Sequence, residues 1–170
     1  MKPQSNWRLL HLALSVILLD QLTKLMVLKY LGFAEEKTVI AGFFKLVHWG
    51  NTGAAWSMFT GNNRVLAAIA MIALIVLFLS RRHFAIHTLG GQVSLGLIFG
   101  GIVGNLIDRL LPSRQHVIDF LYFYVVRRDD VIASFPAFNV ADSAICGGVA
   151  LLFILSWRTE PAEAVAETKT

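Results

Sequence analysis

The chain has 170 residues, enough for one domain of ordinary size. Hydrophobic residues make up 56% of it and charged residues only 15%, against about 25% charged residues in soluble domains, which excludes an ordinary soluble protein. Lysine and arginine outnumber aspartate and glutamate by 15 to 11, but they are scattered, without the basic stripe that nucleic-acid binding requires, so nucleic acid is not an expected partner.

Four segments are long and apolar enough to span a bilayer, which takes about 20 mostly apolar residues. We predict membrane-spanning helices at about 9–28, 65–80, 89–111 and 137–157. The predicted fold class is therefore an all-α membrane protein, with residues 1–157 forming a single polytopic domain. The segment 158–170 is rich in glutamate, alanine and threonine and is predicted to be a disordered tail.

Four spans place both termini and the short loop 81–88 on one side, and the long loops 29–64 and 112–136 on the other. Basic residues near span ends accumulate on the cytoplasmic side of a membrane. They are denser on the side of the termini, which carries Lys2, Arg8, Arg81, Arg82, Arg158 and Lys169. We therefore expect cytoplasmic termini, a cytoplasmic tail and extracytoplasmic long loops.

The first long loop contains a run of β-forming residues from Phe43 to Trp49, followed by a turn signal over residues 50–53. This pattern predicts a small extracytoplasmic β-structure in that loop. In the third span, Gly96, Gly100 and Gly104 recur at four-residue spacing, which lets two helices approach closely in lipid. We expect this glycine stripe to serve helix packing.

Several ionisable side chains lie in or next to the predicted spans, where an unpaired charge costs from about 2.5 to more than 10 kcal/mol. They are Asp20, Lys24, Asp108, Arg109 and Asp142, with Asp119 in the apolar run 117–121. The predicted topology brings the long-loop ends of the spans to one membrane boundary. We therefore expect these residues, together with Asn51, Asn105 and Asn139, to form a polar pocket there.

Each of these residues also has a structural interpretation. Asp20 and Lys24 suit an ion pair on one helix face, and Asp142 suits the first turn of a helix. Arg109 points about 100° away from the preceding aspartate, so it suits a contact with a loop or with another carboxylate. The three asparagines suit turns or interhelical hydrogen bonds. Asp119 has no helix end and no cation beside it in the sequence, and a functional role is favoured for it.

Two carboxylates that face each other at the edge of an apolar medium share one proton near neutral pH. The ionised member can activate a water that attacks a carbonyl carbon, and the protonated member can donate a hydrogen bond to the carbonyl oxygen. Such peptide hydrolysis uses no cofactor and no metal, and none is predicted. Serine and zinc peptidases are disfavoured because the sequence has no GxSxG or HExxH motif. A small transporter or proton relay and a purely structural membrane subunit remain alternatives.

Five motifs occur in order along the chain: DQLTK at 20–24, NTGAA at 51–55, GNLIDR at 104–109, VIDF at 117–120 and FPAFNVADS at 135–143. With these motifs the chain resembles the bacterial lipoprotein signal peptidases, also called signal peptidase II. The resemblance runs nearly end to end. It departs modestly at Gly50, where an aromatic residue or arginine is frequent, and at Trp56, where phenylalanine is common.

The resemblance implies an aspartic endopeptidase of the bacterial inner (plasma) membrane, with its active site near the outer leaflet and its catalytic groups at Asp119 and Asp142. It implies substrate-binding or supporting roles for Asp20, Lys24, Asn51, Gly53, Asn105, Asp108, Arg109 and Asn139. The implied substrates are prolipoproteins cut just before a diacylglyceryl-modified cysteine. Membrane lipids are implied partners, and cyclic peptide antibiotics such as globomycin are implied inhibitors. A small extracytoplasmic sheet typical of the family would correspond to residues 38–50.

Overall fold

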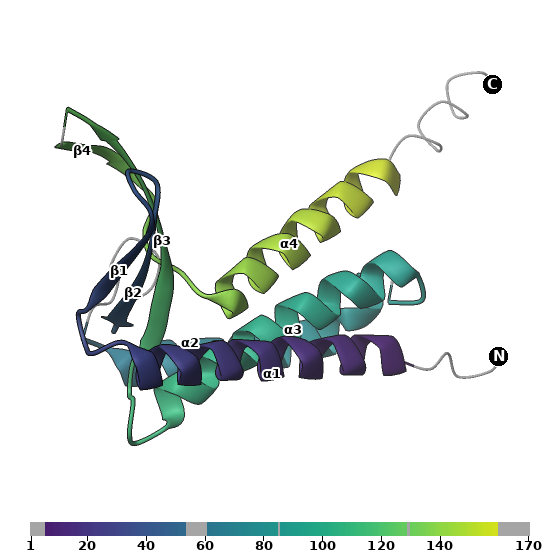
Figure 1. The fold of residues 1–170 in the computed structure, drawn as a ribbon. Coiled ribbons are helices and arrows are strands. Elements are labelled where there is room, and N and C mark those ends of the chain that lie inside the picture. Colours follow the sequence, from purple (N-terminus) through teal and green to yellow (C-terminus); the bar gives the residue numbers. More distant parts are fainter. Residues whose placement is uncertain (1–5, 54–60, 85, 129, 160–170) are drawn as a thin grey trace, which may run out of the picture.

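The computed structural model describes residues 6–53, 61–84, 86–128 and 130–159. Ala54, Ala55 and Trp56 of the motif region, and the predicted tail from residue 160 onward, lie outside these ranges. The helices described are α1 (Trp7–Tyr30), α2 (Asn63–Ser80), α3 (Leu89–Leu110) and α4 (Val140–Thr159), with a short 3₁₀ turn at Arg81–His83. The strands are β1 (Glu36–Ile40), β2 (Phe44–Asn51), β3 (Val117–Arg127) and β4 (Asp130–Ser134). Figure 1 shows the strands gathered at one end of the helices, and the beginning of α1 and the end of α4 at the other.

All four of these helices are long and apolar enough to cross a membrane. They have 18 to 24 residues, which at 1.5 Å per residue corresponds to about 27 to 36 Å. Large apolar side chains remain exposed on their outer surfaces, among them Leu18, Ile72 and Leu79. Lipid would cover these side chains, and the predicted framework of four membrane-spanning helices is confirmed.

The start of the fourth helix differs from the prediction. We expected the span to begin at residue 137, but α4 begins at Val140. Phe138 instead pairs with Leu121 of β3 in an antiparallel bridge, and Asn139 caps the helix, so residues 137–139 belong to the connection with the sheet. At the other end α4 continues to Thr159, which places residues 158–159 in the helix and not in the predicted tail.

The strands form one antiparallel sheet in the order β1-β2-β3-β4, larger than predicted because β3 and β4 come from the second long loop. The turn expected at residues 50–53 begins later, since Gly50 and Asn51 still pair with Ile118 and Val117 of β3. A Cβ atom at position 50 would lie 2.8 Å from Cδ2 of His116, so a larger residue there requires the His116 side chain to move. The strand therefore carries Asn51 to its very end.

Helix α3 packs closely against α1 and α4. A Cβ on Gly100 would lie 2.7 Å from Cβ of Val16 in α1, and a Cβ on Gly148 of α4 would lie 2.7 Å from the carbonyl oxygen of Ser94 in α3. Gly96 is equally tight, with the carbonyl oxygen of Leu9 only 3.0 Å from such a Cβ. The close approach predicted from the glycine stripe is confirmed, with α1 as its partner.

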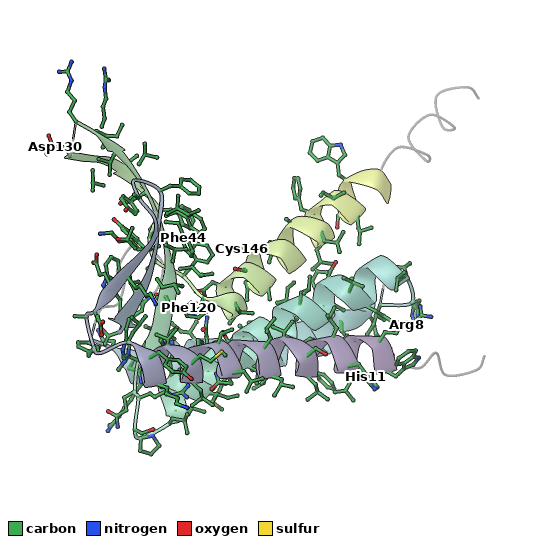
Figure 2. All side chains as sticks on the ribbon, in the orientation of Figure 1. Arg8, His11, Phe44, Phe120, Asp130 and Cys146 are labelled. Carbon is green, nitrogen blue, oxygen red and sulfur yellow. The ribbon has the colours of Figure 1, made fainter. Side chains whose placement is uncertain are left out.

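The sheet is anchored to the helices by an apolar cluster in which Val27 and Leu31, from the end of α1 and just beyond it, meet Ile118 and Phe120 of β3. All four are buried. Figure 2 shows Phe120 at this junction, with Arg8 and His11 at the opposite end of the helices. The cluster holds the beginning of β3 against the end of α1. Asp119 lies between Ile118 and Phe120, the two residues that β3 contributes to the cluster.

Candidate active site

Polar side chains from α1, α3, α4, β2 and β3 meet where the sheet joins the helices. This network includes all ten residues singled out from the sequence: Asp20, Lys24, Asn51, Gly53, Asn105, Asp108, Arg109, Asp119, Asn139 and Asp142. Asp20, Lys24, Asp108 and Asn139 have no exposed surface. Because buried polar groups are stable only when they are paired, their contacts define what each one does.

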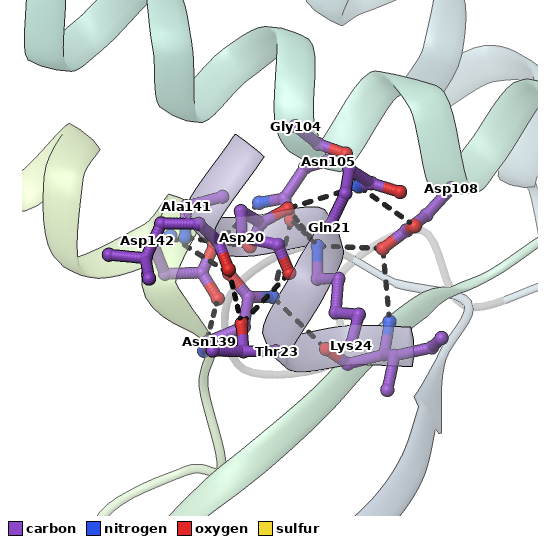
Figure 3. Close-up of polar contacts among 12 residues, drawn as sticks. Asp20, Gln21, Thr23, Lys24, Gly104, Asn105, Asp108, Asn139, Ala141 and Asp142 are labelled. Carbon is purple, nitrogen blue, oxygen red and sulfur yellow. Dashed lines mark hydrogen bonds and ion pairs between the residues drawn. The ribbon is translucent and has the colours of Figure 1, made fainter. Parts of the chain in front are cut away.

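Lys24 joins α1 to α3. Its Nζ lies 2.9 Å from Oδ2 of Asp20 and 2.7 Å from Oδ2 of Asp108, and it also donates to Oδ1 of Asn105 at 2.9 Å. The ion pair predicted between Asp20 and Lys24 is therefore present. Lys24 also pairs with a second carboxylate, that of Asp108. Figure 3 shows these contacts between α1 and α3.

Asp20 also holds the beginning of α4. Its Oδ1 accepts a hydrogen bond of 3.0 Å from the backbone N–H of Ala141, one of the first-turn donors that a helix cannot satisfy internally. Its negative charge also favours the positive end of the helix dipole. Gly104 of α3 leaves the space for this carboxylate, since a Cβ there would lie 2.7 Å from Oδ2 of Asp20. The glycine stripe thus also makes room for a buried charge.

Asn139 and Asp142 form a reciprocal cap at the start of α4. Oδ1 of Asn139 accepts from the backbone N–H of Asp142 at 3.0 Å, and Oδ2 of Asp142 accepts from the backbone N–H of Asn139 at 3.2 Å. This is the geometry of a capping box, with aspartate in place of the usual glutamate. The other oxygen of Asp142, Oδ1, accepts from Nδ2 of Asn105 at 2.7 Å. The first-turn role that the sequence allowed for Asp142 is present, and the same carboxylate also faces the network.

Asp119 is brought to the same place by β3. Its Oδ2 accepts from Nδ2 of Asn51 and its Oδ1 from Nδ2 of Asn139, both at 2.9 Å. Burial, followed by the charge of Asp142, raises the pKa of Asp119 to about 7, and the two amide hydrogen bonds oppose this rise. Asn139 therefore contacts both carboxylates, one through its side-chain amide and the other through its backbone N–H.

Arg109 contacts the segment that directly follows Asn51, the last residue of β2. Its Nη2 donates to the carbonyl oxygen of Gly53 at 2.8 Å, and its Nη1 donates to Oδ1 of Asn63 at 3.1 Å. The N–H of Gly53 in turn donates to Oδ1 of Asn51 at 2.9 Å, which leaves Nδ2 of Asn51 directed at Asp119. From the sequence, Arg109 was expected to contact either a loop or another carboxylate. The structure contains the loop contact, with Gly53.

Two further members of the network were not singled out from the sequence. Nε2 of Gln21 donates to Oδ2 of Asp20 and Oδ1 of Asp108, at 3.1 and 3.3 Å. Arg114 forms an ion pair with Asp108 and donates to Oε1 of Gln21 at 2.9 Å. Gln21 directly follows Asp20 in the first motif, which is a usable signal. Arg114 carries only the weak signal of a lone arginine in the connection between α3 and β3.

The network can perform acid and base chemistry with carboxyl groups. Both oxygens of Asp119 and both oxygens of Asp142 accept hydrogen bonds from neutral amides, while the lysine and arginine side chains contact other groups. Among the residues that the structure describes, no three histidine, cysteine, aspartate or glutamate side chains are placed to hold a metal ion.

A family model described as "Signal peptidase (SPase) II" matches residues 12–158. The chain is 38% identical over 151 residues to a "Lipoprotein signal peptidase" of Anoxybacillus flavithermus, covering 88% of this chain and 84% of that protein. It is 39% identical to a protein of the same name from Bacillus subtilis, covering 84% and 88%. A solved structure described as a bacterial membrane enzyme, at 2.3 Å resolution, superposes with a TM-score of 0.74 and 32% identity over 91% of this chain and 92% of that one.

Proposed function

The chain belongs to the signal peptidase II family, proteases that remove signal peptides from lipoproteins, and we propose that it is an aspartic endopeptidase whose catalytic groups are Asp119 and Asp142. The observation that carries the proposal is the arrangement around Asn139, which holds both carboxylates through neutral donors at 2.9 and 3.2 Å. Neutral donors position the carboxylates and leave the pair able to share one proton.

We place the site at the outer leaflet of the bacterial inner membrane, with both termini in the cytoplasm. The chain is a multi-pass membrane protein, and the network lies at the sheet end of the helices, opposite the beginning of α1 and the end of α4 (Figure 1). The proposed substrate is a prolipoprotein with a diacylglyceryl-modified cysteine, cut just before that residue. Its acyl chains keep it in the leaflet, so it reaches a site at the membrane edge by diffusing in two dimensions. Cyclic peptides such as globomycin are proposed to compete with it.

In the first chemical step, the ionised member of the pair takes a proton from a water molecule as the water oxygen attacks the carbonyl carbon of the scissile peptide. The protonated member transfers its proton to the carbonyl oxygen as negative charge develops there. Asn51, Asn105 and Asn139 keep the carboxyl oxygens oriented during this step. The product is a tetrahedral intermediate, with the proton from water on the aspartate that acted as the base.

In the second step, the intermediate collapses. The proton taken from water passes to the leaving amide nitrogen, the C–N bond breaks, and the carbonyl forms again as its oxygen returns a proton to the pair. The pair ends with one shared proton, ready for the next substrate. Asp119 and Asp142 titrate as a unit, so the roles of acid and base belong to the pair.

Lys24 supports this chemistry indirectly, because it contacts Asn105 and not the proposed catalytic carboxyls themselves. It forms ion pairs with Asp20 and Asp108 and donates to Asn105, whose amide in turn contacts Asp142. A cation in direct contact with the pair would hold both carboxyls ionised and remove the acid.

Membership of a protease family argues against the transporter and the purely structural alternatives.

The test is cleavage of a diacylglyceryl-modified prolipoprotein by the purified protein in lipid. We expect Asp119→Asn and Asp142→Asn each to abolish cleavage while remaining folded. Asp130→Asn is the matched control, because Asp130 is an exposed carboxylate at the far end of the sheet (Figure 2), and it should cleave like the wild type. Full cleavage by either of the first two variants would refute the assignment of the pair.

A further inference from the structure

A second buried cation, Arg114, completes the charge balance of the network. Asp20 and Asp108 are both fully buried carboxylates, and Lys24 alone would leave one negative charge uncompensated. Arg114 supplies the missing charge through its ion pair with Oδ1 of Asp108, and its side chain is only 8% exposed. It lies outside all five motifs that relate this chain to its family.

The connection between α3 and β3 is folded so that Arg114 turns back onto α3. The backbone N–H groups of Arg114 and Gln115 both donate to the carbonyl oxygen of Leu111, at 3.0 and 3.1 Å. Gln115 has a φ of 57°, in the left-handed region that a residue with a side chain seldom adopts. The tight turn places the guanidinium beside Asp108 and starts β3 two residues later, at Val117.

Asp108 connects Arg114 to the strand that carries the proposed catalytic aspartate. One oxygen of Asp108, Oδ1, meets Arg114 and Gln21, and the other, Oδ2, meets Lys24 and the backbone N–H of Ile118 at 3.5 Å. Ile118 immediately precedes Asp119 and has no exposed surface. The orientation of the Asp108 carboxylate therefore bears on where β3 begins.

Gln21 locks the same carboxylate from α1. Its Oε1 accepts from Arg114 at 2.9 Å, while its Nε2 donates to the carbonyl oxygen of Gly104 at 3.0 Å as well as to Asp108. One amide thus spans α1, α3 and the turn. Because Oε1 of Gln21 is bonded to the turn and Nε2 to α3, the amide is held in a single orientation.

We infer that Arg114 and Gln21 form a positioning unit that holds the start of β3, and with it Asp119, at the distance from Asp142 that peptide cleavage needs. The inference rests on the proposed function. Neither residue is expected to touch the substrate, so both act on the rate through Asp108 and the backbone of β3. A displacement of about 1 Å at a catalytic group lowers a rate roughly 100-fold.

The test compares Arg114→Met, Arg114→Lys and Gln21→Leu in lipid-reconstituted protein. Arg127→Met is the matched control, because Arg127 is an exposed arginine at the end of the same strand. Arg114→Met should lower kcat roughly 10- to 100-fold, as expected for a small displacement of a catalytic group, with KM within about twofold of the wild type. Arg114→Lys should recover most of kcat by restoring the charge. The double variant of Arg114→Met with Gln21→Leu should be no slower than Arg114→Met alone, since the two residues act as one unit.

A readout independent of activity accompanies the kinetics. Hydrogen exchange of peptides covering residues 115–121 should be faster in Arg114→Met, while peptides of α2 exchange at the wild-type rate. If Arg114→Met does not fold, the same measurements are made on Gln21→Leu. That variant keeps the ion pair between Arg114 and Asp108.

A folded variant with wild-type kcat and wild-type exchange at 115–121 overturns the inference, as does a loss confined to KM. The proposed function fails separately, if the wild type does not cleave or if Asp119→Asn cleaves normally. In that case the exchange measurement still decides whether Arg114 positions β3.

Discussion

Cleavage should decline above about pH 7 because the proposed pair needs one proton. Burial and the charge of Asp142 raise the pKa of Asp119 from 3.8 to about 7, so this carboxyl is protonated below that pH and ionised above it. Once both members are ionised, no acid remains to donate to the substrate carbonyl. With saturating substrate we expect kcat to fall about tenfold for each pH unit above the transition.

Asn51→Leu tests the cause of this behaviour. Nδ2 of Asn51 donates to Oδ2 of Asp119 at 2.9 Å and favours the ionised form. A hydrogen bond to a charged group contributes about 1.5 to 3 kcal/mol, which corresponds to about one to two pH units. Leucine has a similar volume and keeps water out, so the variant should raise the pKa of Asp119 further. The alkaline decline of its residual activity should then move to higher pH by about one unit or more.

The same shift makes a prediction about stability. A folded-state pKa above the unfolded value means that the folded protein binds more protons, so the stability contributed by Asp119 is fully present below about pH 4 and is lost as pH rises through about 7. The rise from 3.8 to about 7 corresponds to a loss on the order of 4 kcal/mol. Asp119→Asn, which cannot ionise, should lose less stability than the wild type between pH 4 and pH 8.

The measurements are pH profiles of kcat and of thermal unfolding in lipid, for the wild type, Asn51→Leu and Asp130→Asn. Asp130 is exposed and outside the network, so its variant should follow the wild type. If the alkaline fall of kcat in Asn51→Leu occurs at the same pH as in the wild type, or at lower pH, the reasoning is refuted. That reasoning holds that burial raises the pKa of Asp119 and that the hydrogen bond from Asn51 lowers it.

Three further outcomes follow from the network. Lys24→Met should lower the free energy of unfolding by about 3 to 5 kcal/mol, because it leaves the fully buried carboxylate of Asp20 without its cation. Lys45→Met, which breaks the partly exposed pair with Glu36, should cost about 1 kcal/mol or less, and thermal unfolding in lipid compares the two. Gly104→Ala should destabilise by about 1 to 3 kcal/mol through overpacking and should slow cleavage, since the added methyl group would lie 2.7 Å from Oδ2 of Asp20. Unchanged stability in Gly104→Ala would contradict the packing described.

The parts of the fold that depend on local sequence were predictable. A helix that crosses a membrane must satisfy its backbone internally and bury about 20 apolar residues in lipid, so length and composition alone located the four spans. The size of the sheet was not predictable in this way. Residues 121–126 are as rich in β-forming residues as residues 43–49, but their pairing joins segments more than 60 positions apart. Local patterns indicate a strand without naming its partner.

The site was predictable to the extent that topology gathers charged residues at one membrane boundary. Asp20, Asp108, Asp119 and Asp142 were found because each is an ionisable group in an apolar context. Arg114 was missed because its position depends on a tight turn with a left-handed residue, which propensities disfavour and tertiary contacts impose. A loop arginine is ordinarily solvated, and nothing in the local sequence distinguishes this one.

The two halves of the network solve different physical problems with the same kinds of side chain. On one side, the buried carboxylates of Asp20 and Asp108 contact Lys24 and Arg114, so their charges are compensated and they can stabilise the fold. On the other, the carboxyls of the proposed pair contact neutral amides, so no cation in direct contact holds them ionised. Asn105 divides the halves, since its oxygen accepts from Lys24 while its nitrogen donates to Asp142. An amide at this position connects the two halves without placing a cation against the pair, and so leaves the pair the proton that the proposed reaction requires.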